Sequence, residues 1–289
     1  MSNVIFNKLL ILGVGLIGGS LALAAKHAGV VSEVRGWSRR QVTLQRALEL
    51  GVVDSVEHDL QRALQDVDCV VVATPSQFAA KLLVDVVARV PKQVVITDVA
   101  SVKGNLAAAL RDAYKTMPAN VVLGHPIAGS EKSGVEAARA SLFDGQRVIL
   151  TPDPHTAADA LQAIESLWRA CGASVHEMST DAHDRVFGMT SHLPHVLAYA
   201  LVDFLAAQPA HEQIFDYSGA GFRDFTRIAG SDPRMWQEIV QANKEALLIA
   251  IEGYENKLAE IKAAMQHDRG DELQTLFDRA KAARDAHST

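Results

Sequence analysis

The chain has 289 residues, of which 48% are hydrophobic and 21% are charged, which is typical of a globular protein with a buried core and is long enough for two domains. A formal net charge of −6, with no basic block to offset it, argues against a nucleic-acid partner. Two cysteines are too few for a disulfide framework or a zinc site.

The first apolar stretch, residues 9–25, is interrupted by glycines and a serine. It therefore predicts a strand, a turn and a helix rather than a membrane span or a signal peptide. We expect a cytoplasmic protein that makes no contact with a membrane.

Up to residue 178, short apolar runs alternate with helical patterns. The expected strands are residues 9–12, 33–37, 69–73, 94–98, 121–123, 147–150 and 174–178. The expected helices are residues 16–27, 39–50, 77–89, 104–115 and 156–170. Several strands are continuous apolar runs, as in strands covered on both faces. Residues 1–178 are therefore predicted to form a doubly wound, mainly parallel α/β sheet.

The strand pattern disappears after residue 179. The clearest helix begins at Ser231-Asp232-Pro233, where a polar cap and an early proline suit a first turn. Apolar residues recur at helical spacing as far as Ile261, which corresponds to a helix of about 45 Å, and no strong breaker appears before Gly270. Such a helix suits an intersubunit surface, so residues 179–289 are predicted to form an all-helical dimerisation domain, with a monomeric helical cap as the alternative.

A Gly-x-Gly-x-x-Gly motif follows the first strand, with glycines at Gly13, Gly15 and Gly18. At the head of a helix, these glycines permit a tight turn, close approach of the backbone to a pyrophosphate, and packing of the helix on the sheet. The backbone N–H groups of Leu16 and Ile17 would bind phosphate at the helix N-terminus. The motif predicts a Rossmann-type dinucleotide site; the alternative is a glycine turn that binds no ligand.

The second strand leads into Ser38-Arg39-Arg40, where an acidic residue would bind the ribose hydroxyls of NAD. A guanidinium suits a ribose 2′-phosphate instead, so NADP is favoured over NAD as the cofactor. The alternative is that the two arginines only begin a solvated helix.

Two later segments also follow buried strands, at the strand ends where open α/β sheets bind ligands. Thr74 and Pro75 are expected to border the cofactor. Ser101 is expected either to contact a ligand or to cap the helix that follows it.

His125 begins the most unusual stretch, a loop of small residues at 125–134. Removing a hydride from an alcohol requires an acceptor for the hydroxyl proton, and neutral histidine suits that near pH 7. We therefore expect activity to fall as the pH drops through the histidine range. The alternative is a structural histidine that bonds to the backbone.

In the second half, His192 and His195 share one helix face, but no third ligand completes a metal site, so no metal is expected. Arg227, beside a glycine-rich loop, is a candidate for binding a substrate carboxylate, with an ordinary surface arginine as the alternative. Trp236 is interpreted mainly as a core residue. The pair His183-Asp184 is interpreted as packed side chains and is assigned no chemistry.

Together these motifs resemble the prephenate/arogenate dehydrogenase family over nearly the whole chain. The resemblance is carried by the glycine motif and by residues 98–104 (DVASVKG), 125–134 (HPIAGSEKSG), 191–195 (SHLPH) and 224–229 (DFTRIA). It implies an NAD(P)-dependent oxidative decarboxylation of prephenate or arogenate in tyrosine biosynthesis. It also implies a homodimer whose helical domains intertwine.

The resemblance further implies roles for individual residues. His125 would accept a hydrogen bond from the ring hydroxyl of the substrate, and Ser101 would bond the same region. His195 and Arg227 would position the carboxylate or side-chain groups. The remaining implied contacts are Glu131, which would modulate access, Ser130 and Trp236, which would line the site, and Ala220, within a Gly219–Gly221 loop near the substrate of the neighbouring subunit.

Two other functions are compatible with parts of the sequence. A dehydrogenase of small β-hydroxy acids shares the two-domain plan and would use a lysine in the helical half, where Lys244 is the candidate. A non-catalytic nucleotide sensor would keep the glycine motif but would have no use for His125, His195 and Arg227 together.

Overall fold

The computed structural model of the chain describes residues 4–129 and 132–287. The described residues up to Asn243 form one compact unit, and those from Lys244 onward form a second.

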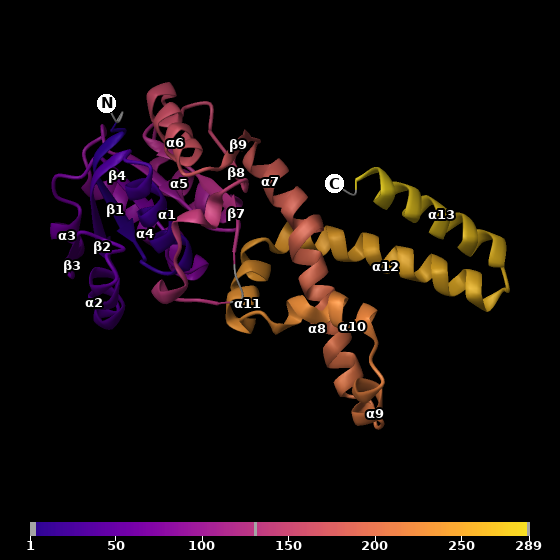
Figure 1. The fold of residues 1–289 in the computed structure, drawn as a ribbon. Coiled ribbons are helices and arrows are strands. Elements are labelled where there is room, and N and C mark those ends of the chain that lie inside the picture. The colour runs from indigo at the N-terminus through magenta and orange to yellow at the C-terminus, as the bar shows by residue number, and fades with distance from the viewer. Residues whose placement is uncertain (1–3, 130–131, 288–289) are drawn as a thin grey trace. The chain divides into compact units, whose positions relative to one another are not determined.

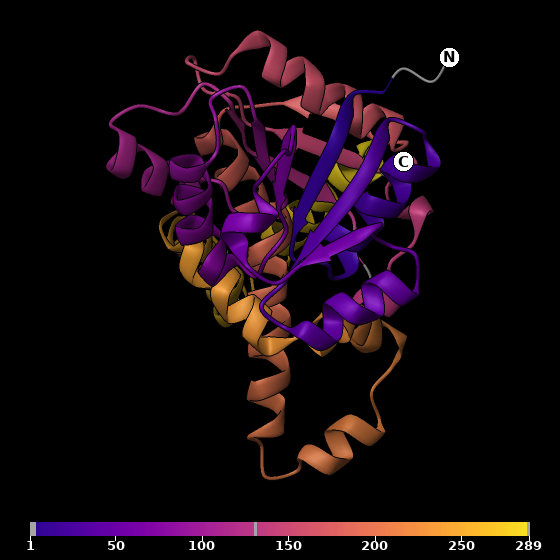
Figure 2. The ribbon, with the colours of Figure 1, turned by 90° about the vertical axis from the view of Figure 1, so that its left-hand side faces the viewer.

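The first unit is built on a six-stranded sheet in which every pair of neighbouring strands is parallel (Figures 1 and 2). The spatial order is β3 (Ser55–Glu57), β2 (Val31–Trp37), β1 (Phe6–Leu12), β4 (Cys69–Val72), β5 (Val95–Asp98) and β6 (Val121–Val122). The chain runs outward from β1 in one direction and then returns to continue outward from β4 in the other. This is the order of a dinucleotide-binding Rossmann sheet, so the expected fold class is confirmed.

Helices cover both faces of this sheet, and side chains alternate between two cores. Leu9 and Ile11 pack into one core, while Leu10 and Leu12, their neighbours along β1, pack into the other. The helices of this region are α1 (Leu16–His27), α2 (Gln41–Glu49), α3 (Leu60–Ala63), α4 (Ser76–Arg89), α5 (Gly104–Tyr114) and α6 (Ala158–Ala170). Burial on both faces explains why the central strands read as continuous apolar runs.

A second sheet of three strands was not expected. It consists of β7 (Gly124–Ile127), which runs antiparallel to β8 (Arg147–Leu150), and β9 (Ser174–Glu177), which runs parallel to β8. The prediction that His125 lies in a loop is therefore wrong, because His125 is in β7, opposite Ile149. A glycine and a proline in a four-residue strand mask its β pattern. Two short 3₁₀ turns, η1 (Val135–Ala137) and η2 (Ala140–Phe143), precede β8.

The rest of the first unit is helical. It contains α7 (Thr180–Phe187), the π-helical turn η3 (Gly188–His192), α8 (Leu193–Ala206), α9 (His211–Asp216), α10 (Ala220–Thr226), the 3₁₀ turn η4 (Arg227–Gly230) and α11 (Pro233–Ala242). The first three follow one another as one continuous rod in Figure 1. Pro194 lacks the N–H that would bond four residues back, and a wider turn just before a proline accommodates that loss.

The long helix expected from Pro233 to Gly270 is interrupted. Asp232 caps α11 by accepting bonds from two backbone N–H groups, as predicted, but α11 ends at Ala242. Asn243 leaves helical geometry, with φ −108° and ψ 32°, and its side-chain amide donates to the carbonyl oxygen of Asp184 at 2.8 Å. Apolar spacing continues across Asn243, which is why the sequence did not reveal the break.

The second unit is a helical hairpin of α12 (Lys244–Gln266) and α13 (Gly270–Ala286), which contact one another. Several large apolar side chains of these helices are exposed, namely Leu248, Ile249, Tyr254, Leu258, Met265 and Phe277. Within residues 4–129 and 132–287, no helix has the length and apolar character needed to cross a membrane.

Candidate active site

The glycine turn lies at the carboxyl ends of β1 and β4, where the strand order reverses. Gly13 has φ +105°, and a Cβ there would lie 2.4 Å from the carbonyl oxygen of Ala73. A Cβ on Gly18 would lie 2.2 Å from the carbonyl oxygen of Gly13. Both glycines are therefore required by the protein's own packing, which lets the turn sit directly against the end of β4.

Gly15 has a different reason to be glycine. A Cβ at this position would meet nothing within 4 Å, so the space in front of it is open. Gly15 is also the N-cap of α1 and offers no side chain to cap it, so the N–H groups of the first turn, including those of Leu16 and Ile17, have no acceptor within the helix. Across the turn, the hydroxyl oxygen of Thr74 is buried without a partner, and Pro75 is the N-cap residue of α4. An open space, free N–H groups and an orphaned hydroxyl together fit a dinucleotide pyrophosphate.

Ser38, Arg39 and Arg40 connect β2 to α2 at the same edge of the sheet. The hydroxyl of Ser38 accepts a hydrogen bond from the backbone N–H of Arg40 at 3.2 Å. The guanidinium of Arg39 lies 3.7 Å above the ring of Phe78. Both arginine side chains are exposed to solvent and therefore accessible to a ligand.

A buried ion pair joins β5 to β7. Asp98 and Lys103 bond to one another, and both side chains are 0% exposed. Asp98 accepts the backbone N–H of Gly124 at 3.1 Å, and Lys103 donates to the carbonyl oxygen of Gly124 at 2.7 Å. Burial lowers the pKa of Lys103, while the charge of Asp98 opposes that shift. The pair fixes Gly124, the residue before His125, a role that could not be expected from the sequence.

His125 directly follows Gly124 in β7. Its side chain is the first of three side chains that are hydrogen bonded in series. Its Nδ1 is 2.9 Å from Nε2 of His183, and Nδ1 of His183 is 2.7 Å from a carboxylate oxygen of Asp184. Phe187 packs against both imidazoles, with ring centroids 5.0 Å from His125 and 4.6 Å from His183. His183 therefore contacts the principal candidate directly, and Asp184 is linked to it through His183, although neither residue was assigned any chemistry from the sequence.

Burial determines the charge of these groups. It lowers the pKa of His125 well below its ordinary range, and positive charge on His183, Lys103 and His192 would lower it further. Burial also lowers the pKa of His183, although the hydrogen bond to Asp184 opposes the shift. For Asp184, burial acts to raise the pKa, but the bond from His183 and the backbone N–H groups of Lys103 and Gly104 outweigh it and lower the pKa. At neutral pH both imidazoles are therefore neutral and Asp184 is ionised.

A second cluster surrounds Trp236, which is 8% exposed. The ring of His195 stacks on it with centroids 3.5 Å apart, and His192 meets its edge at 6.1 Å. Burial lowers the pKa of His195, the bond from its Nδ1 to the carbonyl oxygen of Ser191 opposes this, and the charge of Arg227 lowers the pKa further. These contacts bring His195, Trp236 and Arg227 into one neighbourhood.

His192 connects the two clusters. Its Nδ1 is 3.0 Å from the side-chain nitrogen of Asn243, which also binds the backbone of Asp184. Burial lowers the pKa of His192 to about 4, so the ring is neutral. Asn243 is 4% exposed, and it was not singled out from the sequence because nothing distinguishes an asparagine inside an apparently continuous helix.

The other expected site residues are less closely connected. Ser101 precedes Val102, which packs with Trp236, but the N-cap position of α5 is Lys103, so the alternative that Ser101 caps this helix is wrong. Ala220 is the exposed first residue of α10. Ser130 and Glu131 lie outside the described residues.

Within the part of the chain that the structure describes, no group of three or more acidic, histidine or cysteine side chains could hold a metal ion.

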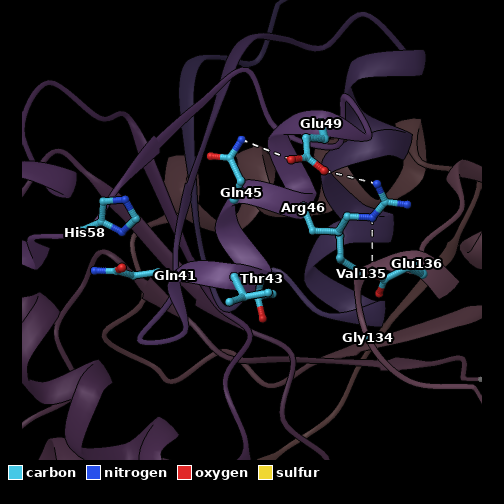
Figure 3. A pocket seen from close by; sticks show the side chains of 10 residues that line it. Gln41, Thr43, Gln45, Arg46, Glu49, His58, Gly134, Val135 and Glu136 are labelled. Carbon is cyan, nitrogen blue, oxygen red and sulfur yellow. Dashed lines mark hydrogen bonds and ion pairs between the residues drawn. The ribbon is translucent and has the colours of Figure 1, made fainter.

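An open hollow lies beside α2 (Figure 3). Arg46 lies in it and pairs with Glu49 at 3.3 Å and with Glu136 at 3.5 Å. The described lining includes none of the expected site residues; it consists of Gln41, Val42, Thr43, Gln45, Arg46, Glu49, His58, Gly134, Val135 and Glu136. Its charged groups bind one another, which gives no indication of a ligand.

Comparisons with known proteins identify one family over most of the chain. Residues 21–177 match the family model "Prephenate dehydrogenase, nucleotide-binding domain", and residues 179–279 match "Prephenate dehydrogenase, dimerization domain". A cyclohexadienyl dehydrogenase of Zymomonas mobilis is 35% identical over 99% of this chain and 97% of its own length. The crystal structure of prephenate dehydrogenase from Aquifex aeolicus, in complex with hydroxyphenyl propionate and NAD+, is 35% identical with a TM-score of 0.90, and the match covers 98% of each chain. A Synechocystis arogenate dehydrogenase is 27% identical with a TM-score of 0.84, over 97% of this chain and 100% of that one.

Proposed function

This chain belongs to the prephenate dehydrogenase family of NAD(P)-dependent oxidoreductases, and we propose that it catalyses the oxidative decarboxylation of prephenate, arogenate or both in tyrosine biosynthesis. The observation that carries the proposal is the placement of His125. Through Gly124 and Asp98 it is anchored at the carboxyl end of β5, on the same sheet edge as the glycine turn after β1 and as Thr74 after β4. A hydroxyl-bearing carbon bound there would meet His125 as proton acceptor, while the glycine turn and Thr74 would hold the cofactor that supplies the hydride acceptor.

The chemistry follows from the neutral state of His125. When bound, the nicotinamide supplies the hydride acceptor. His125 accepts the hydroxyl proton as the carbon–hydrogen electron pair leaves the same carbon. The ring then loses its carboxylate as carbon dioxide, and the electrons of the broken carbon–carbon bond complete an aromatic ring. Gain of aromaticity drives the step, so the protein has to orient the substrate and hold one proton.

The second cluster suits the binding of the rest of the substrate. Arg227 and His195 would bind a carboxylate or the side chain, and Trp236 would contact the ring. Ser101 would bond near the hydroxyl, and Ala220 would approach the site of a neighbouring subunit. A guanidinium can bind a carboxylate with two parallel hydrogen bonds, which suits an anionic substrate in a chain of net charge −6.

The test is an absorbance assay at the reduced-nicotinamide band, crossing prephenate and arogenate with NAD and NADP. Turnover in at least one combination is expected, and the ratios of kcat/KM would identify the preferred pair. No turnover in any combination, with cofactor binding intact, would contradict the proposal and favour a small β-hydroxy acid as substrate.

The cofactor preference is proposed to be NADP. Ser38, Arg39 and Arg40 supply a hydroxyl and two guanidiniums directly after β2, where a ribose phosphate would lie. Replacing both arginines with alanine should raise KM for NADP about 10- to 100-fold, because charge-assisted hydrogen bonds are lost. KM for NAD, measured on the same variant, serves as the control and should change little. A wild-type protein that prefers NAD, or equal losses with both cofactors, would contradict this preference.

We also propose a homodimer formed through residues 179–289 as the helical domain. The family match to a dimerisation domain and the exposed apolar side chains of α12 support it. Ile249 is 64% exposed, and Ile249→Lys should weaken self-association at least about 100-fold, because a charge would have to be buried at the interface. Light scattering after size exclusion measures the mass. The matched variant Ile249→Leu should remain a dimer; a monomeric wild type, or a dimeric Ile249→Lys, would contradict the proposal.

A further inference from the structure

We propose that His183 and Asp184 form a positioning relay behind His125, which fixes the tautomer of His125 and stabilises the charge it gains during the reaction. The relay deepens the proposed dehydrogenase function and rests on it. Its members are consecutive in the chain but lie 58 and 59 positions from His125, and their contacts run in one line from a carboxylate to the reacting imidazole.

The protonation state of each imidazole nitrogen follows from the charge of Asp184. Asp184 is ionised, so it can only accept, and Nδ1 of His183 must carry the proton that it donates. Because His183 is neutral, its Nε2 then has a lone pair and must accept. The bond of 2.9 Å to His125 therefore requires that Nδ1 of His125 be the donor. This leaves a lone pair on Nε2 of His125, which is the atom that must take the hydroxyl proton.

Asp184 is itself held in place. Its two carboxylate oxygens accept the backbone N–H groups of Lys103 at 2.9 Å and Gly104 at 2.7 Å, at the N-terminus of α5. The positive end of the helix dipole favours the ionised carboxylate there. A Cβ on Gly104 would lie 2.6 Å from one of these oxygens, so only glycine allows so close a contact. The glycine of the DVASVKG segment thus has a physical reason in this chain.

The relay matters most as His125 becomes charged. The O–H bond of the substrate breaks, an N–H bond forms at Nε2, and the imidazolium continues to donate from Nδ1 to His183. Asp184 and Asp98 then offer negative charge to this side of the site, against the positive charge of Lys103 and the neutral ring of His192. Without an acceptor at Nδ1, either nitrogen of His125 could carry the proton, and the tautomer protonated at Nε2 could not act as a base.

Two substitutions at one position separate this role from packing. His183→Asn is short: its amide reaches the place of Nδ1 and can still bond Asp184, but it leaves His125 without an acceptor. His183→Gln is longer, and its amide oxygen can occupy the place of Nε2 and accept from His125. We expect His183→Asn to lower kcat about 100-fold, since a wrong tautomer of a catalytic histidine is costly. His183→Gln should recover turnover to within about 10-fold of wild type, and KM for both substrates should stay within about 3-fold.

Nitrogen chemical shifts of the imidazoles, measured on the cofactor-free protein, give a readout that does not depend on turnover. In the wild type, His125 should be protonated at Nδ1, and in His183→Asn it should be a mixture. Protonation at Nε2 in the wild type would overturn the relay, and so would equal losses of kcat in both variants. If His183→Asn does not fold, Gly104→Ala offers a second variant, because the added Cβ displaces the carboxylate of Asp184 while both histidines are retained. It should lower kcat with KM preserved, and an unchanged kcat would overturn the relay. A wild type with the expected tautomer but no turnover would instead contradict the proposed function and leave the relay standing.

Discussion

Replacing His125 with asparagine should reduce kcat by about 10²- to 10⁴-fold, the usual contribution of a general base, while KM for the organic substrate rises no more than about 3-fold. Asparagine retains a polar side chain of similar size at the anchored position after Gly124, so the strand pairing of β7 with β8 should persist. It cannot accept a proton in the reaction. Steady-state kinetics with the preferred cofactor measures kcat and KM separately. A variant with near-normal turnover would contradict the assignment of His125 as the general base.

The pH dependence of wild-type activity provides the control for His125→Asn. The active form of His125 is neutral, and burial lowers its pKa well below the ordinary value of 6.5. Activity should therefore be retained as the pH falls through the ordinary histidine range and be lost only at more acidic pH. This prediction differs from the expectation from sequence, which placed the loss within that range. The acidic limb of kcat/KM should be absent from the residual activity of His125→Asn; a limb near pH 6.5 in the wild type would indicate a solvated base.

The fold could be predicted because its signals are local. The helix at Leu16–His27 was expected at its observed bounds, since a glycine turn precedes it and one apolar face packs on the sheet. The central strands are continuous apolar runs, buried on both sides, and they were also predicted correctly. The strand β7 was not predicted, because a glycine and a proline, Gly124 and Pro126, are typical of a loop. Its β geometry comes from pairing with β8, which lies more than twenty residues further along the chain.

The site was only partly predictable for a related reason. His125, His195 and Arg227 stand out by chemical type beside glycines and small residues. The groups that set their state do not: Asp184 acts on His125 through His183, and Asn243 acts on His192 from the end of α11. The contacts of His125 with His183 and of His192 with Asn243 each join residues more than fifty positions apart, so no spacing within one segment indicates them. Trp236, expected mainly as core, is both buried and stacked on His195.

The largest effect on stability is expected at the buried pair of Asp98 and Lys103. Lys103→Met should lower the free energy of unfolding by about 3–5 kcal/mol, because the carboxylate of Asp98 would remain buried without its counterion. The backbone N–H groups of Ala100 and Gly124 would still donate to it, but they carry no net charge. Urea denaturation monitored by tryptophan fluorescence measures the change.

A double-mutant cycle distinguishes the pair from two independent polar residues. In Asp98→Asn combined with Lys103→Met, both charges are absent and the amide oxygen can still accept the N–H of Gly124, so the double variant should be more stable than the sum of the single losses predicts, by about 1–3 kcal/mol. Additive losses would show that the two side chains act separately. Turnover should nevertheless stay low in the double variant, since Lys103 no longer donates to the carbonyl oxygen of Gly124 and His125 loses part of its anchor. Recovered stability without recovered turnover would mean that the ion pair is retained for the position of His125 rather than for the fold.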